Sequence, residues 1–399
     1  MSGVSSTLST PQMRILVFLH SFGPGGVERV GLRLGGAWAD AGHDVRILMG
    51  RREGPEKRVA PHNVIYDFAP PHWLARPFET LWMVRQLVGA IRRHQPDVLF
   101  CAGGTYTIVA AIVRLILRSE CPPVVCKLSS SLDRRDLPLP ARFGHAFWLR
   151  QHRWFVDRFV ALSSVMGEEI ATRLRVAPER VWLIPNPVLT NEDLKSLSTA
   201  GRGRNGRGRL FVAVGRLTRC KNYGLLMRAF AQIATAEDRL LVVGEGPQRA
   251  ALSRVAAKLG ISGQLRMPGH VASIAEVLGS ADVFVSSSNY EGLPGVIVEA
   301  LAAGLPIVAT ASSPNIGHVL RGGELGQIVP IRDLSALANA LENAGTRESM
   351  PVDTMLSVAA QYTIERSAAL YLHVLALAAA SHVDIRRSIE LEPLQEAVG

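Results

Sequence analysis

The order of a buried strand, a glycine-containing turn and a helix occurs in both halves of the sequence, and it restricts the fold more than any other feature. In the first half, residues 14–20 (RILVFLH) form an apolar run typical of a buried parallel strand. The turn SFGPGG and a helical pattern over residues 27–41 follow it, and Gly42 separates that pattern from the next apolar run, HDVRILM. This order predicts a doubly wound α/β domain.

The first domain is expected to end near residue 185. Its further strands are predicted at residues 98–101, 124–128, 159–163 and 181–184. Pro185-Asn186-Pro187 then has the composition of a turn. Residues 196–209 (SLSTAGRGRNGRGR) lack an apolar period and are typical of a flexible linker. A basic nucleic-acid-binding arm is the alternative, but no aromatic residues alternate with these arginines.

The strand, turn and helix pattern begins again after that segment. Strands are expected at residues 210–214, 240–243, 265–267, 283–286 and 307–309, and helices at 222–234, 247–259, 273–278 and 296–303. The sequence therefore predicts two Rossmann-like domains, residues 13–185 and 186–362, that face each other across a cleft. A helix over residues 363–380 is expected to pack back on the first domain, and residues 381–399 are expected to form a polar, partly disordered tail.

The charge of the chain is concentrated in its first half. The net charge is +10, and residues 1–185 hold 24 Lys and Arg against 15 Asp and Glu, or +9. This excess predicts an anionic partner, which could be nucleic acid, anionic lipid or a phosphorylated substrate. No apolar run reaches the roughly 18–20 residues of a membrane span, and no secretory signal is recognisable. A cytosolic protein, free or bound to the membrane from that side, is expected, with its four cysteines reduced.

Glycines follow the first predicted strand. In the loop Gly23-Pro24-Gly25-Gly26, backbone N–H groups and a helix N-terminus could approach an anion, although a tight turn is the simpler interpretation. A dinucleotide-binding dehydrogenase would instead carry GxGxxG and an acidic residue after the second strand. Here that strand ends at Gly50-Arg51-Arg52, which disfavours an oxidoreductase.

Two segments of the second half carry charged residues at predicted strand ends. Arg216 and Lys221 lie in GRLTRCKN, where two cations could hold a diphosphate. Glu291 and Glu299 lie eight residues apart in EGLPGVIVE, so a carboxylate of the mostly apolar helix could return to the same cleft and bind vicinal hydroxyls. The turn VVGEGP at residues 242–247 has the composition of a common strand-to-helix turn.

In this order, GGVER, IPNPV, VGRLTRCKN, VVGEGP and EGLPGVIVEALAAGLPIVAT resemble the family 4 glycosyltransferases of GT-B fold over roughly residues 13–375. The resemblance implies a retaining enzyme that transfers a sugar from a nucleotide-sugar, needs no metal or other cofactor, and binds its acceptor in the N-terminal domain. It implies catalytic roles for Arg216, Lys221 and Glu291 at the diphosphate and the transferred sugar. The other implied donor-binding residues are Gly25, Gly26, Gly292, Leu293, Pro294, Gly295, Val296 and, on the ribose, Glu299.

The resemblance has one departure. Family members commonly carry a histidine after the fourth or fifth strand of the N-terminal domain, where this sequence has CKLSSS. Lys127 or Ser129 could take its place on the acceptor side, or His145 or His152 could reach in from the following helix. No catalytic histidine is assigned.

The acceptor is expected to be a glycan or a lipid-linked molecule at the cell envelope. Residues 143–159 and 71–93 mix Trp and Phe with Arg, a composition that suits an anionic membrane surface, although core aromatics with a solvated basic face would look the same. The predicted function is transfer from a nucleotide-sugar, UDP favoured, to a lipid-linked, polysaccharide or lipopolysaccharide acceptor. The alternative is a sugar-nucleotide enzyme of GT-B shape acting on a soluble small molecule. Nucleic acid is not expected as a partner, because Glu291 and Glu299 would repel phosphate.

Overall fold

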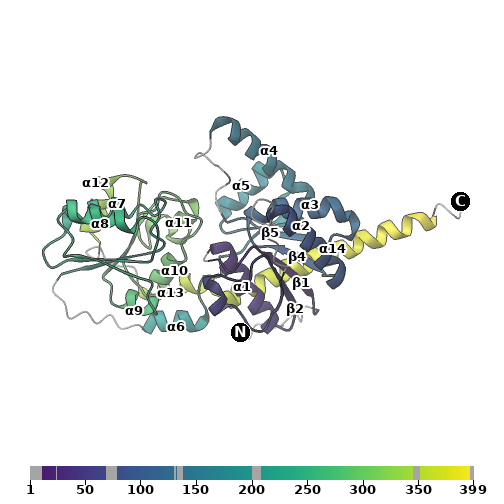
Figure 1. Cartoon of the computed structure of the whole chain (residues 1–399), viewed down its shortest axis with the longest axis horizontal. Coiled ribbons are helices and arrows are strands. Elements are labelled where there is room, and N and C mark those ends of the chain that lie inside the picture. The colour runs from purple at the N-terminus through teal and green to yellow at the C-terminus, as the bar shows by residue number, and fades with distance from the viewer. Residues whose placement is uncertain are drawn as a thin grey trace, which may run out of the picture. The chain divides into compact units, whose positions relative to one another are not determined.

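The computed structural model describes residues 11–23, 25–68, 79–129, 132, 138–199, 208–344 and 351–395. It divides into two compact units, which are coloured along the chain in Figure 1. Unit 1 comprises Met1–Pro187 and Ile364–Gly399, and unit 2 comprises Val188–Thr363. The division lies within two residues of the predicted boundaries at 185 and 362.

Unit 1 is a parallel sheet of seven strands in the order β3-β2-β1-β4-β5-β6-β7. The strands are β1 (Arg14–Leu19), β2 (Asp44–Met49), β3 (Ile65–Phe68), β4 (Val98–Cys101), β5 (Val124–Lys127), β6 (Arg158–Ala161) and β7 (Val181–Leu183). The helices are α1 (Gly26–Asp40), α2 (Glu79–His94), α3 (Thr107–Leu117), α4 (Leu139–Phe155), α5 (Ser164–Leu174) and α14 (Ile364–Gln395). The strands are short, and all except the edge strands β3 and β7 are almost fully buried, as expected where helices cover both faces of a sheet.

Unit 2 repeats this architecture with six parallel strands in the order β10-β9-β8-β11-β12-β13. The strands are β8 (Leu210–Val214), β9 (Arg239–Val243), β10 (Leu265–Gly269), β11 (Val283–Ser286), β12 (Ile307–Thr310) and β13 (Gln327–Val329). The helices are α6 (Asn191–Thr199), α7 (Tyr223–Ile233), α8 (Arg249–Lys258), α9 (Ile274–Gly279), α10 (Gly295–Ala302), α11 (Pro314–Val319), α12 (Leu334–Glu342) and α13 (Val352–Ala359).

Two apolar cores cover the two faces of the unit 2 sheet. Val212 and Phe284 belong to the core shared with α10 and α13, whereas their neighbours Phe211 and Val283 belong to the core shared with α7 and α12. Consecutive residues of a strand point to opposite faces, so each strand contributes to both cores. This explains why the strands read as unbroken apolar runs rather than as alternating patterns.

The segment predicted as a linker is partly helical. α6 includes residues 196–199, the first part of the predicted linker, whereas residues 200–207 lie outside the described part of the chain. A reciprocal cap begins this helix: the Thr190 N–H donates to Asp193 Oδ2 and the Asp193 N–H donates to Thr190 Oγ1, both at 2.9 Å. Leu194 and Leu197 then pack on the α10 core.

The C-terminal helix is longer than the sequence predicted. α14 continues to Gln395, so the expected tail from residue 381 is helical over most of its length. No glycine or proline lies between Ile364 and Pro393, so no residue type in that stretch breaks a helix. α14 belongs to unit 1, where it packs against α1, β4 and β5 (Figure 1). The buried Trp38 Nε1–H donates to Ala368 O at 3.2 Å. None of the described helices has the combination of length and apolarity that crossing a bilayer requires.

Candidate functional site

The order of strands in unit 2 reverses between β8 and β11. The chain after β8 continues toward β9 on one side, and the chain after β11 continues toward β12 on the other. Loops that diverge at the carboxyl ends of two neighbouring parallel strands leave a crevice, which is where open α/β sheets bind ligands. Residues 215–222 follow β8 and residues 287–294 follow β11, so both charged segments singled out in the sequence lie at this point.

An ion pair joins these two loops. Lys221 Nζ lies 2.5 Å from Glu291 Oε1, with 20% and 15% of the two side chains exposed. The Ser288 hydroxyl donates to the same carboxylate oxygen at 2.8 Å. Lys221 and Glu291, far apart in sequence and predicted to act on one ligand, are therefore brought together.

A tyrosine lies beside this pair. Tyr223 is 3% exposed, and its hydroxyl has no hydrogen-bond partner among the described residues. Burial and, second, the charge of Glu291 raise the pKa of this tyrosine well above its ordinary value. A side chain at Gly215 would meet both Tyr223 Oη at 3.0 Å and Lys221 Nζ at 3.2 Å, so the glycine keeps the space in front of these two groups open.

The backbone holds Lys221 and its neighbours in place. The Asn289 N–H donates to Cys220 O at 2.8 Å, and the Ser287 hydroxyl donates to Lys221 O at 2.9 Å. Asn222 has φ +48° and donates from Nδ2 to Asn289 Oδ1 at 3.1 Å. The loops after β8 and β11 therefore form one hydrogen-bonded assembly.

The turn VVGEGP supports the same loop from the other side. The Leu217 N–H donates to Glu245 O at 2.8 Å, and the Gln248 N–H donates to Leu217 O at 2.9 Å. A side chain at Gly244 would overlap Gly215 O, and one at Gly246 would lie 2.5 Å from Leu217 O. Both glycines are required for this close approach. The sequence interpretation of a common turn missed this role.

Arg216 is the exposed cation of the site. It lies between Gly215 and the buried Leu217, so its backbone is fixed while its side chain reaches solvent. The pKa of the neighbouring Cys220 thiol is raised overall, mainly because the thiol is partly buried and then because Glu291 is negatively charged. The positive charges of Lys221 and Arg216 offset part of this rise. Arg216 thus acts in the same local electrostatic field as Lys221 and Glu291.

The segment after Glu291 leads into α10. The Ser313 hydroxyl and Asn315 Nδ2 both donate to Gly292 O, at 2.6 and 3.1 Å. The helix then begins at Gly295 with Pro294 as its N-cap, and Glu299 lies half-buried within it. Of the predicted donor residues, Gly295 and Val296 therefore begin a helix and Gly292, Leu293 and Pro294 lead into it, so that the first backbone N–H groups of the helix are available to an anion.

In unit 1 the strand order reverses between β1 and β4, and the predicted glycines lie there. Gly25 is the N-cap of α1 and Gly26 is its first residue. The carboxylate of Glu28 lies against Gly25, and Glu28 Oε1 accepts a hydrogen bond from the Tyr106 hydroxyl at 2.7 Å. The sequence interpretation missed Glu28, whose negative charge opposes an anion at the glycines and suits a hydroxyl-rich ligand.

The acceptor-side candidates lie at and after the end of β5. Lys127 is the last residue of this strand and is 2% exposed, and burial lowers its pKa to about 7. Ser129 is half-buried two residues later. His152 is buried among Trp148 and Phe155, a place typical of a core histidine.

The remaining titratable groups do not form a metal centre in the part of the chain that the structure describes. No three His, Cys, Asp or Glu side chains converge there in a way that could hold a metal ion. All four cysteines are free thiols: Cys101, Cys121 and Cys126 are buried and Cys220 is exposed.

Two family models match this chain in tandem. The model described as Glycosyltransferase Family 4 matches residues 24–192, and the model described as Glycosyl transferases group 1 matches residues 208–346. The chain is a family 4 glycosyltransferase of GT-B fold. Together the matches cover most of the sequence, and the first ends at residue 192, close to the division between unit 1 and unit 2 after Pro187.

Solved glycosyltransferases have the same fold. The apo form of the lipopolysaccharide outer core galactosyltransferase WaaB superposes with a TM-score of 0.70 at 16% identity, over 91% of this chain and 99% of WaaB. Anabaena HepE in complex with UDP-glucose superposes with a TM-score of 0.66 at 19% identity, over 94% of this chain and all of HepE. At these identities the likeness establishes the fold alone.

Curated relatives share shorter segments. The lipopolysaccharide core biosynthesis glycosyltransferase LpsE of Rhizobium meliloti is 35% identical over 131 residues, 33% of this chain and 38% of LpsE. An uncharacterized glycosyltransferase of Methanocaldococcus jannaschii is 30% identical over 62% of this chain and 63% of that protein. The match to an exopolysaccharide phosphotransferase of Streptomyces coelicolor spans 27% of that protein's length. The alignments thus span well under half of LpsE and of the phosphotransferase.

Proposed function

We propose that this family 4 glycosyltransferase transfers a hexose from a nucleotide-sugar, with UDP as the nucleotide, to an acceptor of cell-envelope glycan synthesis, and that it retains the anomeric configuration. The observation that carries the proposal is the pairing of Lys221 with Glu291 beside Arg216 at the unit 2 switch point. A diphosphate requires cations and a sugar requires hydrogen-bond acceptors, and this place supplies both.

The donor is proposed to lie across the two loops of this site. Lys221 and Arg216 would bind the diphosphate, Glu291 would face the transferred sugar, and Glu299 would accept hydrogen bonds from the ribose. Gly292, Leu293, Gly295 and Val296 would contribute backbone N–H groups and Pro294, which has none, would contact the donor, while Gly25 and Gly26 of unit 1 stay part of the proposed donor set. HepE, which shares the fold, forms complexes with UDP and UDP-glucose, which supports UDP as the first nucleotide to test.

The reaction breaks the bond between the anomeric carbon and the diphosphate oxygen and forms one from that carbon to an acceptor hydroxyl oxygen. Negative charge develops on the leaving diphosphate, whose oxygen takes up the proton that the acceptor hydroxyl loses. Lys221 and Arg216 are preorganised to stabilise that charge, which is usually the largest catalytic contribution. Because they supply positive charge in the place where a divalent cation could act, we propose that no metal is needed. Unchanged transfer in excess EDTA is the expected result, and loss that Mg²⁺ or Mn²⁺ restores would overturn this part.

The acceptor is proposed to bind unit 1, with Lys127 and Ser129 on its side. The name of LpsE places that protein in lipopolysaccharide core biosynthesis. A relative from Campylobacter jejuni, 23% identical over 44% of this chain, is named for an acceptor linked to undecaprenol diphosphate. The positive charge of residues 1–185 supports a phosphorylated acceptor and work at the cytoplasmic face of an anionic membrane. A soluble acceptor is the second candidate, because another match, over 33% of this chain, is to an N-acetyl-alpha-D-glucosaminyl L-malate synthase of Bacillus anthracis.

The test is transfer of labelled sugar from a panel of UDP-, GDP- and ADP-sugars to membrane extract and to malate. A UDP-sugar is expected to label the lipid or polysaccharide fraction, and Lys221→Met is expected to lower the rate by at least about 100-fold. The control is Arg228→Gln, an exposed arginine on α7. Labelling of malate alone would replace the envelope acceptor with the soluble one. No transfer from any donor, with protein that is folded, would refute the proposed activity.

A further inference from the structure

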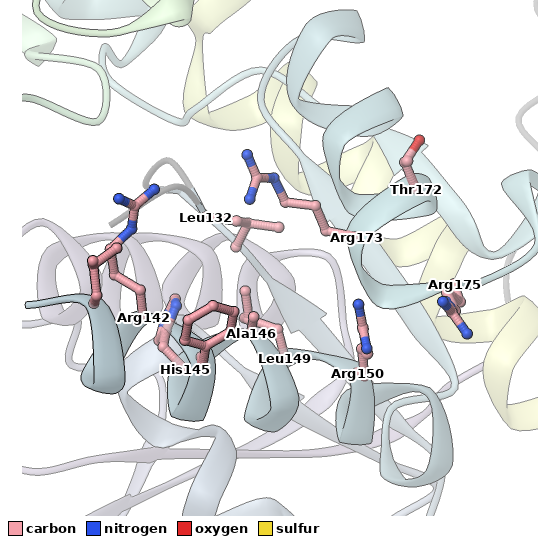
Figure 2. Close-up of a pocket in the computed structure, with 11 residues that line it drawn as sticks. Leu132, Arg142, His145, Ala146, Leu149, Arg150, Thr172, Arg173 and Arg175 are labelled. Atoms are coloured by element: carbon pink, nitrogen blue, oxygen red, sulfur yellow. The ribbon is translucent and has the colours of Figure 1, made fainter. Parts of the chain in front are cut away.

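A second concave site lies between α4 and α5 of unit 1, on elements separate from the diphosphate site. Figure 2 shows this pocket, whose volume is about 630 Å³. Its eleven lining residues are Leu132, Leu139, Arg142, Phe143, His145, Ala146, Leu149, Arg150, Thr172, Arg173 and Arg175. Four arginines and no acidic residue are found among the described residues that line it, and this favours an anionic ligand.

The arginines come from both walls. Arg142 and Arg150 rise from α4, and Arg173 and Arg175 come from the end of α5 (Figure 2). Arg173 pairs with Glu169 at 3.0 Å. Arg150 and Arg175, both exposed, make no ion pair with any residue that the structure describes, so their charge is available to a ligand.

The rest of the lining is apolar except for His145 and Thr172. Leu132 and Leu149 are 6% and 5% exposed and form a buried floor, whereas Leu139 and Phe143 at the rim are 66% and 75% exposed. A small hydrated anion or a sugar would gain little binding energy from contact with these buried leucines. A molecule with a charged head and a hydrocarbon part satisfies both the arginines and the leucines.

The outer face of α4 continues this apolar rim. Leu139, Phe143, Phe147 and Trp154 are 66%, 75%, 67% and 69% exposed. At 100° per residue these positions fall within about 80° of one another around the helix, opposite the buried face that carries Leu149, His152 and Phe155. On the same count Arg150 lies within this stripe, between Leu139 and Phe143, and Arg142 lies about 60° outside Leu139. A helix whose exposed face combines large apolar side chains with arginines suits the interface of an anionic bilayer.

We propose that the pocket between α4 and α5 binds the phosphate-bearing head of a lipid held in a bilayer, while the exposed stripe of α4 lies in the interface of that bilayer. The inference rests on the proposed work at a membrane and names the surface responsible. Guanidinium groups bind phosphate through paired N–H donors, and Arg150 and Arg175 supply them. The apolar floor under Phe143 takes the beginning of the hydrocarbon chain. A nucleic acid or a second copy of the chain would use the arginines or the stripe, but neither occupies the buried leucine floor.

The charge arm of the test uses flotation of the full-length protein with vesicles. Binding is expected to vesicles containing phosphatidylglycerol and not to pure phosphatidylcholine. Arg150→Gln with Arg175→Gln is expected to weaken binding about 30-fold, since each basic residue near an anionic surface contributes roughly a factor of five. Arg228→Gln with Arg254→Gln removes the same charge from exposed positions of unit 2 and should leave binding within about twofold. Equal loss in both pairs would mean that net charge acts rather than the pocket, and would overturn the proposal.

The apolar arm uses the stripe. Phe143→Ser with Phe147→Ser is expected to lower vesicle binding at least about tenfold. Leu115→Ser with Ile116→Ser, which changes two residues of α3 that are 75% and 52% exposed, is the matched control and should not. Binding that both pairs leave unchanged would overturn the placement of α4 in the interface.

Two further readouts separate this inference from the proposed function. Binding of UDP should be the same in all four double variants, because none of these residues belongs to the diphosphate site. Wild-type protein that binds UDP but no anionic vesicle would refute the lipid site and leave the transferase proposal standing. Wild-type protein that binds anionic vesicles but not UDP would support the lipid site and refute the proposed donor site. Stabilisation by inorganic phosphate or by RNA that depends on Arg150 and Arg175, without vesicle binding, would replace the lipid with that ligand.

Discussion

The close approach of Gly244 to the loop after β8 yields the sharpest prediction from the structure. Gly244 has φ +134°, and a side chain there would overlap Gly215 O and lie 2.9 Å from the Gly215 carbonyl carbon. Both atoms are backbone, so no side chain can turn aside to make room. Gly244→Ala must therefore move the segment that carries Arg216 and Lys221.

The cost has two parts. A non-glycine residue in this backbone region costs about 1–3 kcal/mol, and overpacking against fixed atoms costs about 1–3 kcal/mol more. We expect Gly244→Ala to lower the free energy of unfolding of unit 2 by about 3 kcal/mol. In a unit of this size that corresponds to a fall in Tm of about 6–12 °C. The affinity for UDP should fall at least about tenfold, because the displaced loop carries the diphosphate ligands.

Two other glycines of unit 2 provide matched controls. Gly260 has φ +72° but no atom within 4 Å of the position that a methyl group would take, so Gly260→Ala should cost only about 1 kcal/mol and leave UDP binding unchanged. Gly263 also has open space and no positive φ, so Gly263→Ala should leave the Tm within about 1 °C. The assays are thermal unfolding and calorimetric titration with UDP. If Gly244→Ala matches Gly263→Ala in both, the reasoning from close packing is refuted.

Three further predictions concern charged and buried groups. Lys221→Met should destabilise unit 2 by about 2 kcal/mol, because Glu291 keeps its charge in a partly buried place; a double-mutant cycle with Glu291→Gln should give a coupling of about 1–3 kcal/mol, and additive effects would exclude the pair. Tyr223→Phe should raise stability by about 1 kcal/mol, since it removes a buried hydroxyl without a partner; a loss of that size would mean that the hydroxyl is satisfied. Burial lowers the pKa of Lys127 to about 7, below its unfolded value of about 10.4, so the unfolded state binds more protons between pH 7 and 10 and the free energy of unfolding should rise with pH there. Lys127→Met should reduce that rise by on the order of 2 kcal/mol between pH 7 and 9. The free energy of unfolding is measured by urea titration at each pH, and an equal dependence on pH in both proteins would contradict the lowered pKa of a buried Lys127 amine.

The two-domain α/β fold could be predicted because each buried strand leaves a local signal. β4, β8 and β11 have the predicted bounds, since each consists of three to five consecutive apolar residues close to turn residues, a pattern that suits a strand covered on both faces. β3 and β13 were not predicted. β3 (IYDF) includes an aspartate and β13 has three residues, so their place in the sheet depends on neighbouring strands rather than on their own composition.

The charged residues of the site could be predicted, but their supports could not. Lys221 and Glu291 each follow an apolar strand within a few residues, and this placement can be recognised from the sequence alone. Their contact requires β8 and β11 to be neighbours, and strand order is a tertiary property. The role of Gly244 likewise depends on a backbone segment some 30 residues away, so its turn looked ordinary.

The most direct test of the central claim is calorimetric titration of UDP into the purified protein and into Arg216→Ala, Lys221→Met and the control Arg228→Gln. One UDP site is expected, with affinity reduced at least about tenfold in each of the first two variants and unchanged in the control. Equal affinity in all four proteins, or no UDP binding by folded wild-type protein, would contradict the placement of a nucleotide-sugar diphosphate at the unit 2 switch point.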